Sequence, residues 1–465
     1  MSINSTLSIA AQALKAQQLA IQTTGHNLAN AATPGFSRQR VDLVSAFPSF
    51  EGGVFLGQGV DVAGVQRVID KFVEAELLSL NSSVVYADAQ SQALGSVQDA
   101  LPTSGGIDAA LSAFFNALSD VANNPGGTAE RVSLVGKANA LGNALAETRQ
   151  VLTSEQNNLD QNVTDSAQQV NAVVSQIATL NGQISATEIH GESANDFRDQ
   201  RQTLLQKLTN LTNATVREEA NGEVTVTAGG LLLVGGDRFA SLQTDTVGAG
   251  GLHNVTYITP GGESLDATSL FKQGKIGSLL SLRDIQLPSM IDRLDQIAQT
   301  LVDQVNTQHA LGFDLTGTAG GDFFAPIAAT VGAANNVKVD GAIVADPRRI
   351  AVAAAWDTVP GDNRNAQALV GLQATTFAAV GNLTLQDSFL SLVGDIGSQI
   401  QDAQNRATFQ QALLTQTQAR RESVSGVNVD EEMTKLIEFQ RAFESSSMMV
   451  RTADQMYQTL IDMVK

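Results

Sequence analysis

The chain has 465 residues and a formal net charge of -19, because 47 acidic residues outnumber 28 basic ones. The basic residues do not cluster beyond pairs such as Arg348-Arg349 and Arg420-Arg421, which argues against nucleic acid and anionic membranes as partners. The absence of cysteine excludes disulfide bonds, thiolate catalysis and cysteine-based metal sites. Aromatic residues make up only 5% of the chain, a composition that suits long helices with shallow cores better than a deep enzyme pocket.

The first thirty residues predict an amphipathic helix. Its large apolar residues recur every seven positions, at Leu7, Leu14, Ile21 and Leu28, a spacing that places them on one face. The amino end has neither a basic segment nor an unbroken apolar stretch before Lys15, so we expect no cleaved signal peptide. No apolar run reaches 18 residues, and we therefore expect no membrane insertion.

A sharp turn is expected directly after this helix. The sequence runs through Asn30 into Thr33, Pro34, Gly35 and Phe36. Pro34 cannot continue a helix and disfavours helical geometry at Thr33, while Gly35 permits a turn that other residues resist.

The next 160 or so residues predict a short extended arm followed by helices. From Gly52 to Val68 apolar residues alternate with glycine, which indicates short strands or an extended arm. Helical periodicity returns near Asp70 and continues to about Thr212, with breaks at residues 102–106 and 124–127. A 3-4 spacing predicts one long packed helix in this stretch, through Val163, Val170, Val173, Ile177, Leu180 and Ile184.

A change of period marks a β-rich insert over residues 213–265. Asn221-Gly222 lies between two alternating runs and predicts a two-residue hairpin turn, because both residues tolerate positive φ. Glycine pairs separate further short strands. Helix resumes from about Ile276 to Ala310, a short mixed region covers residues 312–360, and two helical stretches follow between Asn365 and Arg421.

The carboxyl end predicts a second amphipathic helix with a heptad spacing. Its main apolar row consists of Val429, Leu436, Phe443, Val450, Tyr457 and Val464, with Met433 and Ile461 at alternate positions. Both terminal stripes need an apolar partner, because chain ends fray unless something ties them down. They can pair with each other or with neighbouring subunits.

The expected fold is therefore mainly α with β-rich inserts and discontinuous domains. The terminal domain combines residues 1–68 with residues 425–465, whose helices pair as a coiled-coil-like bundle. An elongated helical middle domain is formed by residues 69–212 and 266–424, and the small β insert at 213–265 interrupts it.

No catalytic, cofactor or metal site is predicted. The histidines at 26, 190, 253 and 309 stand far apart, and the sequence has no H-E-x-x-H, phosphate-loop, dinucleotide or G-x-S-x-G motif. Asp314 and Asp322 are possible calcium ligands, but their loop lacks EF-hand spacing and is interpreted as a turn. Asp430, Glu431 and Glu432 indicate a helix amino terminus. A secreted hydrolase or peptidase domain in the β insert stays an alternative, without a nucleophile-base pair to support it.

The opening turn carries a resemblance to a known family. NLANAATPGFSRQ, which includes the turn residues Asn30 to Phe36, resembles the amino-terminal signature of bacterial flagellar axial proteins of the rod, hook and hook-associated group. Phe36 stands where tyrosine is common in that family.

Two longer motifs narrow the resemblance to the hook-associated members at the hook-filament junction. They are NTQHALGFDLTGTAGGDFF (306–324) and SGVNVDEEMTKLIEFQRAFESSSMMVRTADQMYQTLI (425–461), and DNRNAQALVGLQ (362–373) is similar to the same group. Longer members carry a bulky domain where this chain has only residues 325–344, so an outer domain is expected to be missing or reduced. A hook or distal-rod subunit, which shares the amino-terminal signature, remains the competing interpretation.

The resemblance implies a non-enzymatic structural subunit without cofactors. In this family both terminal helices bundle in the inner tube of a hollow filament, so the two apolar stripes are the expected assembly interface. The implied partners are copies of the chain itself, the hook protein, the second junction hook-associated protein, and an export chaperone at the carboxyl helix. The implied location is extracellular, at the hook-filament junction, after secretion through the flagellar type III export apparatus.

Overall fold

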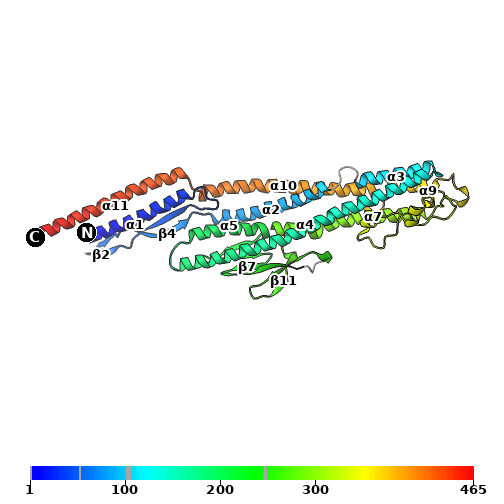
Figure 1. Ribbon diagram of the computed structural model, residues 1–465. Helices are drawn as coiled ribbons and strands as arrows, with labels where there is room; N and C mark the ends of the chain where they lie inside the picture. The colour runs from blue at the N-terminus through cyan, green and yellow to red at the C-terminus, as the bar shows by residue number, and fades with distance from the viewer. Residues whose placement is uncertain (1–2, 52–53, 101–105, 246–248, 465) are drawn as a thin grey trace.

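The computed structural model describes residues 3–51, 54–100, 106–245 and 249–464. The molecule is an elongated rod of long helices, with both chain ends at the same end of the rod (Figure 1). Small antiparallel sheets accompany the helices at two places. The expectation of a mainly α fold with β-rich inserts is confirmed.

The end of the rod that holds both termini is built from two helices and two β-ribbons. It contains α1 (Ile3–Ala29), β1 (Gln39–Ser45), β2 (Ser49–Glu51), β3 (Val54–Leu56), β4 (Val60–Arg67) and α11 (Val429–Val464). β1 pairs with β4 and β2 pairs with β3, both antiparallel. α1 packs against α11 on one side and against β1 and β4 on the other. We call these elements the terminal unit.

The remaining elements form the middle unit, whose helices run along the rod. They are α2 (Lys71–Ala100), α3 (Ile107–Asn123), α4 (Thr128–Ile189), α5 (Asn195–Thr212), α6 (Gly274–Ser281), α7 (Leu287–His309), α8 (Gly341–Ala345), α9 (Arg364–Gly371) and α10 (Leu385–Ser425). The long helix predicted through Val163 and Ile184 is the second half of α4, which has 62 residues. α2 and α10 lie side by side and lead from the terminal unit into the middle unit (Figure 1).

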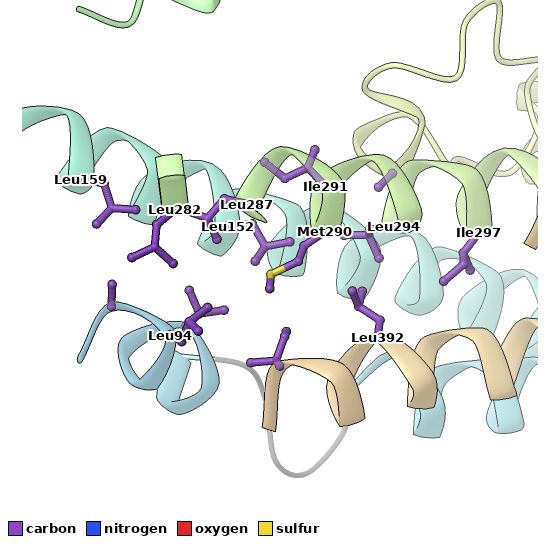
Figure 2. Packing of buried hydrophobic residues seen from close by; sticks show 14 of the residues in the cluster. Leu94, Leu152, Leu159, Leu282, Leu287, Met290, Ile291, Leu294, Ile297 and Leu392 are labelled. Atoms are coloured by element: carbon purple, nitrogen blue, oxygen red, sulfur yellow. The ribbon is translucent and has the colours of Figure 1, made fainter. Parts of the chain in front are cut away.

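The core of the middle unit lies between α4, α7, α2 and α10. Leu159 of α4 lies beside Leu282, and Leu152 lies beside Leu287. Met290 and Leu294 of α7 continue the row, and Leu94 and Leu392 close the cluster from the other side (Figure 2). Apolar residues three and four apart on α7 form the buried face, because that spacing repeats every helical turn. Each large side chain that is fully buried in this way contributes about 1.5–3 kcal/mol.

The predicted helix from Ile276 to Ala310 is not one regular α-helix. α6 and α7 are joined by a π-helical turn, η3 (Leu282–Gln286). Pro288 follows in the first turn of α7. Since proline has no N–H, it cannot donate to the carbonyl of Asp284, and the backbone widens into the π turn just before it.

The β insert consists of two small antiparallel sheets. One has the strand order β5 (Thr215–Glu218), β6 (Val224–Ala228), β7 (Leu231–Gly235) and β8 (Arg238–Phe239); the other has the order β11 (Ser264–Asp266), β10 (Asn254–Ile258) and β9 (Ser241–Asp245). Val224, Val226 and Ala228 alternate toward the core of the middle unit. The insert therefore shares the main core.

The hairpin between β5 and β6 confirms the predicted turn position but differs in turn type. Glu219 and Glu223 close the loop, and the N–H of Gly222 donates to the carbonyl of Glu219 at 3.1 Å. Of the two turn residues, only Gly222 has positive φ, at 81°. The turn is thus a three-residue loop with glycine in the left-handed position, and the predicted two-residue turn is wrong.

The segment around the 306–324 motif is held by two buried polar side chains. The Oδ1 atom of Asn306 accepts the N–H groups of Phe323 and Phe324, at 2.9 and 2.8 Å. His309 is fully buried, with Nδ1 2.7 Å from the carbonyl of Gly321 and Nε2 accepting the N–H of Ala351 at 2.8 Å. These contacts fold the glycine-rich passage back onto the end of α7.

Candidate assembly surfaces

The turn after α1 ends the helix through hydrogen bonds among its own residues. The N–H and the side-chain amide of Asn30 both donate to the carbonyl of His26 at 3.1 Å, and the N–H of Thr33 donates to Asn30 at 2.9 Å. Gly35 has a φ of 82°, and a Cβ at this position would lie 2.7 Å from Oγ1 of Thr203. Left-handed geometry and close packing on α5 therefore both require glycine.

Phe36 and the following residues attach this turn to α5. The ring of Phe36 stacks on His26 with centroids 5.4 Å apart. The N–H of Ser37 donates to Asp199 at 3.0 Å, and the same carboxylate accepts from Arg67, at the end of β4, at 2.7 Å. Asp199 thus binds the chain where it enters β1 and where it leaves β4, and so attaches this end of the ribbon to the middle unit.

A single asparagine joins the three layers of the terminal unit. Asn27 donates to the carbonyl of Gln39 at 2.8 Å and to the carboxylate of Glu432 at 2.9 Å, and it accepts the N–H of Gln39 at 2.9 Å. Asn27 is 1% exposed and Glu432 is 2% exposed. The start of β1 and the start of α11 are therefore fixed to the end of α1.

Ion pairs within each unit flank the joint between them, which the Arg67–Asp199 pair crosses. Arg421 of α10 contacts Glu74 of α2 at 2.7 Å, and Arg38 contacts Glu431 at 3.4 Å. Glu218 of β5 accepts from Lys71 and from Arg198. Burial opposes ionisation of Glu218, but these two cations outweigh it and lower its pKa.

The contact between α1 and α11 is centred on small and polar side chains. α1, which packs on both α11 and the β1–β4 ribbon, buries Ala10, Ala16, Ala20, Thr23, Thr24 and Asn27, and α11 buries Glu432, Ser446 and Ala453. We call this contact the seam. Small side chains let two helices approach closely, but each buries little apolar area.

The large apolar rows predicted from the sequence flank the seam and do not fill its centre. Leu14, Ile21 and Leu28 of α1 and Leu436 and Val450 of α11 are half-buried. Others are exposed by 37–51% of their surface: Leu7, Val429, Phe443, Tyr457 and Ile461. The alternate position Met433 is also exposed, and the side chain of Val464 lies outside the described residues.

The terminal unit exposes many further large apolar side chains. On α11 these are Ile437, Met448, Met449, Met456, Leu460 and Met463, and around the β2–β3 hairpin they are Phe47, Phe50, Val54 and Phe55. Among the described residues, the terminal unit holds more than half of all exposed large apolar side chains although it is the smaller unit. Apolar patches of this kind mark protein interaction sites.

The polar chemistry elsewhere forms structural clusters. Asp160 accepts from the N–H and the ring of His253 and from Arg283. Burial opposes ionisation of Asp160, but these partners lower its pKa. Asp314 accepts the N–H groups of Thr316 and Thr318, as expected in a turn. Within the described part of the chain, no three His, Asp or Glu residues are grouped so that they could hold a metal ion.

Models of known families match three separate parts of the chain. The flagellar hook-associated protein FlgK helical domain matches residues 94–324. The flagellar basal body rod FlgEFG protein C-terminal model matches residues 419–463, and the flagella basal body rod protein model matches residues 7–36. The last two correspond to α11 and to α1 with its turn.

Curated relatives extend this similarity over nearly the whole chain. Flagellar hook-associated protein 1 of Escherichia coli (strain K12) is 27% identical over 99% of this chain and 100% of its own length. The protein of the same name in Bacillus subtilis (strain 168) is 28% identical over 98% of this chain and 97% of its own length. The chain belongs to the hook-associated protein 1 (FlgK) family.

A solved FlgK structure has the same fold. The flagellar hook junction protein FlgK from Burkholderia pseudomallei aligns with a TM-score of 0.67 and 17% identity, covering 76% of this chain and 100% of that chain. In the part of this chain that the structure describes, no helix is long and apolar enough to cross a membrane.

Sequence reasoning missed three residues that fix the terminal unit in place: Asn27 and Glu432 within it, and Asp199 of α5. Asn27 lies within the quoted turn signature, and its position on the inner side of an amphipathic helix could have indicated a buried polar contact. Glu432 was assigned only to the start of a helix. That start is confirmed at Val429, but the buried bond to Asn27 depends on tertiary contacts that spacing does not reveal.

Proposed function

We propose that this chain is a structural subunit of the bacterial flagellum that adapts the hook to the filament at the hook-filament junction. The proposal is supported by membership of the hook-associated protein 1 family over both terminal helices and the helical middle unit. The alternative of a hook or distal-rod subunit is disfavoured, because residues 94–324 match the FlgK helical domain.

The observation that carries the proposal is the surface of the terminal unit. It has few large buried side chains, yet it exposes a long apolar face on α11 and aromatic residues on the β2–β3 hairpin. A subunit that assembles through this unit covers these surfaces with neighbouring subunits. The half-exposed rows Leu7 to Leu28 and Val429 to Ile461 are, in this proposal, part of the assembly interface.

The middle unit has a different role in this proposal. Its closed core and rigid helices present a separate outer surface, so the subunit adds to a hook without continuing the hook lattice. A layer of such subunits ends the hook lattice, because the surface that it presents to the next subunits differs from the surface of the hook. A different lattice can then begin on it. The subunit acts as a mechanical connection and not as an enzyme.

The partners follow from the same arrangement. Copies of the chain form the junction layer, the hook protein lies on one side, and the second junction hook-associated protein lies on the other. Before assembly the exposed face of α11 is covered by an export chaperone, and the chain leaves the cell unfolded through the flagellar type III export apparatus. The assembled location is extracellular.

The test is a deletion strain examined by electron microscopy. Cells that lack this chain should build hooks of normal length, fail to retain filaments, and release filament subunits into the medium. Immunogold labelling of complemented cells should mark the hook-filament boundary. Ordinary filaments on the hooks of the deletion strain would contradict the proposal.

A further inference from the structure

Two apolar surfaces of the terminal unit lie on opposite sides of α1. The first, the aromatic hairpin, consists of Phe47, Phe50 and Phe55, which are 95%, 63% and 71% exposed. The second, the methionine face, consists of Met456, Tyr457, Leu460, Ile461 and Met463 of α11, each about half exposed or more. α1 lies between α11 and the β1–β4 ribbon (Figure 1), so the two surfaces extend from opposite sides of α1 toward the same end of the rod.

The methionine face continues the seam beyond the end of α1. Ala453 is 3% exposed within the seam, whereas Met456 and Leu460, the next positions of the same stripe, are 52% and 48% exposed. Asn27 contacts Glu432, and α1 and α11 run antiparallel from that level. Both Ile3 and Met456 then lie about 36 Å further along, at 1.5 Å per helical residue. The methionine face therefore starts at the level where α1 begins and extends beyond it.

The aromatic hairpin lies at the same level of the rod. β1 starts beside Asn27, where Gln39 forms two backbone hydrogen bonds with its side chain. The ribbon then runs along α1 toward its beginning, because a Cβ on Gly59 would lie 3.1 Å from Ile9. The β2–β3 hairpin extends beyond this point, and Figure 1 shows β2 at the end of the rod that holds both termini.

We propose that the aromatic hairpin of one copy packs on the methionine face of a second copy beside it in the same layer. This inference rests on the proposed function. Because the two surfaces differ and lie at one level on opposite sides of α1, the contact is heterologous and can repeat from copy to copy around a ring.

The chemistry of the two surfaces is complementary. The rings of Phe50 and Phe55 already contact each other with centroids 5.0 Å apart, and they form a compact aromatic tip. Methionine side chains are flexible and make favourable sulfur–aromatic contacts, so they adapt to such a tip. Residues 44–60 contain only Glu51 as a charged residue, and residues 456–464 contain only Asp462. Closing the contact therefore removes few charges from water.

The test uses the natural absence of cysteine. A chain with both Phe55→Cys and Leu460→Cys is expressed in the deletion strain, and isolated hooks are treated with a short bismaleimide crosslinker. We expect a ladder of covalent multimers from the double variant and none from either single variant. Co-expression of the two single variants should give dimers only.

Matched variants control for exposure and assembly. Leu265 of the β insert is 52% exposed, so Leu265→Cys with Leu460→Cys should give no ladder. In a second experiment Phe50→Asp with Phe55→Asp should reduce incorporation at the hook tip at least tenfold, whereas Leu265→Asp should not. Neither experiment depends on the other.

Several outcomes would overturn the inference. They are dimers from Phe55→Cys alone, an internally crosslinked monomer, or normal incorporation of the double aspartate variant. Labelled junctions with attached filaments but no crosslink between positions 55 and 460 would refute this contact and leave the junction function intact. Absence of the wild-type chain from the hook tip would refute the function itself.

Discussion

The terminal unit and the middle unit of this chain differ in what holds them together. The middle unit contains both clusters of buried apolar side chains found among the described residues, from Val73 to Leu414. In the terminal unit the buried positions of the seam are alanine, threonine, serine, one asparagine and one glutamate. One unit is a closed core, and the other is a thin, polar contact between helices.

This difference teaches how stability and assembly are divided along the rod. A buried alanine methyl contributes under about 1 kcal/mol, against about 1.5–3 kcal/mol for a buried leucine or phenylalanine. The terminal unit therefore gains little from folding alone, while its large apolar side chains stay on the surface. We infer that the middle unit carries the stability of the monomer and that the terminal unit is completed by its neighbours.

The largest expected effect comes from the aromatic core of the middle unit. Phe324 is fully buried, with its ring centroid 5.8 Å from that of Phe114 and 4.9 Å from that of Phe323. Phe324→Ala should lower the free energy of unfolding by about 3–5 kcal/mol in urea titrations, because it leaves a cavity. Phe55→Ala, at an exposed position of the terminal unit, should change it by less than about 0.5 kcal/mol. Equal losses of unfolding free energy in the two variants would refute the inference that the middle unit carries the stability of the monomer.

The next prediction asks whether the β insert belongs to the stable unit. Asn181 of α4 is fully buried, and its side chain bonds the N–H and carbonyl of Val224, the carbonyl of Gly236 and the guanidinium of Arg201. Asn181→Ala should cost about 1–3 kcal/mol, because these groups lose their partner. Thr179→Ala, exposed two residues earlier, is the control and should be near neutral. A neutral Asn181→Ala would mean that the insert is only loosely attached.

A third prediction concerns pH and the middle unit only. Burial lowers the pKa of His309, and its Nε2 atom must stay unprotonated to accept the N–H of Ala351. Its stabilising contribution is complete above pH 6.5, the usual pKa, and declines as pH falls below it, by up to about 1.4 kcal/mol per pH unit.

The measurement is the urea midpoint between pH 7.5 and 5.5, a window above most carboxylate titration. His309→Gln should show a flatter dependence than the wild type across this window. An equal slope in both proteins would refute the assignment of the pH effect to His309.

Much of this fold could be predicted, because the spacing of apolar residues along the chain indicates which face of a helix or strand is buried. The apolar faces of α4 and α7, the position of the β insert and the break after α1 all follow from local spacing or from proline and glycine. The π turn before Pro288 and the glycine position in the 219–223 loop depend on hydrogen-bond details. The spacing of residue types does not fix these details.

The assembly surfaces were harder to predict, because heptad spacing does not say which partner a stripe has. Val429, Phe443 and Tyr457 belong to one heptad row. Within one chain, however, the buried positions of α11 lie three residues after Val429 and Phe443 and four before Tyr457, at Glu432, Ser446 and Ala453. On α11 the buried row therefore contains polar residues, and the most apolar row lies outside it, contrary to the usual expectation for an amphipathic helix. The tertiary partner of Glu432, which is Asn27 more than 400 residues away, decides the register.

The smallest expected effect on monomer stability belongs to the terminal unit, and it separates the two halves of the comparison. Leu436 is half-buried and Phe443 is 37% exposed at the edge of the seam. Changing both to aspartate places two charges on a face that we propose is covered only in the assembled layer. In the free monomer these charges stay near water, so the free energy of unfolding of the middle unit should change by less than about 0.5 kcal/mol. In the layer the same charges would be buried without partners, at a cost of several kcal/mol.

The calorimetric transition of the middle unit should therefore stay in place, while incorporation at the hook tip and binding of the export chaperone fall. Thr434→Asp with Ser445→Asp adds the same two charges at exposed positions elsewhere on α11 and is the matched control. If the control blocks incorporation equally, net charge and not the covered face is responsible. If Leu436→Asp with Phe443→Asp incorporates normally, the flanking rows of the seam are not an interface. Reduced stability of the middle unit would instead mean that the two units fold as one, because only a shared core transmits a change from the terminal unit to the middle unit.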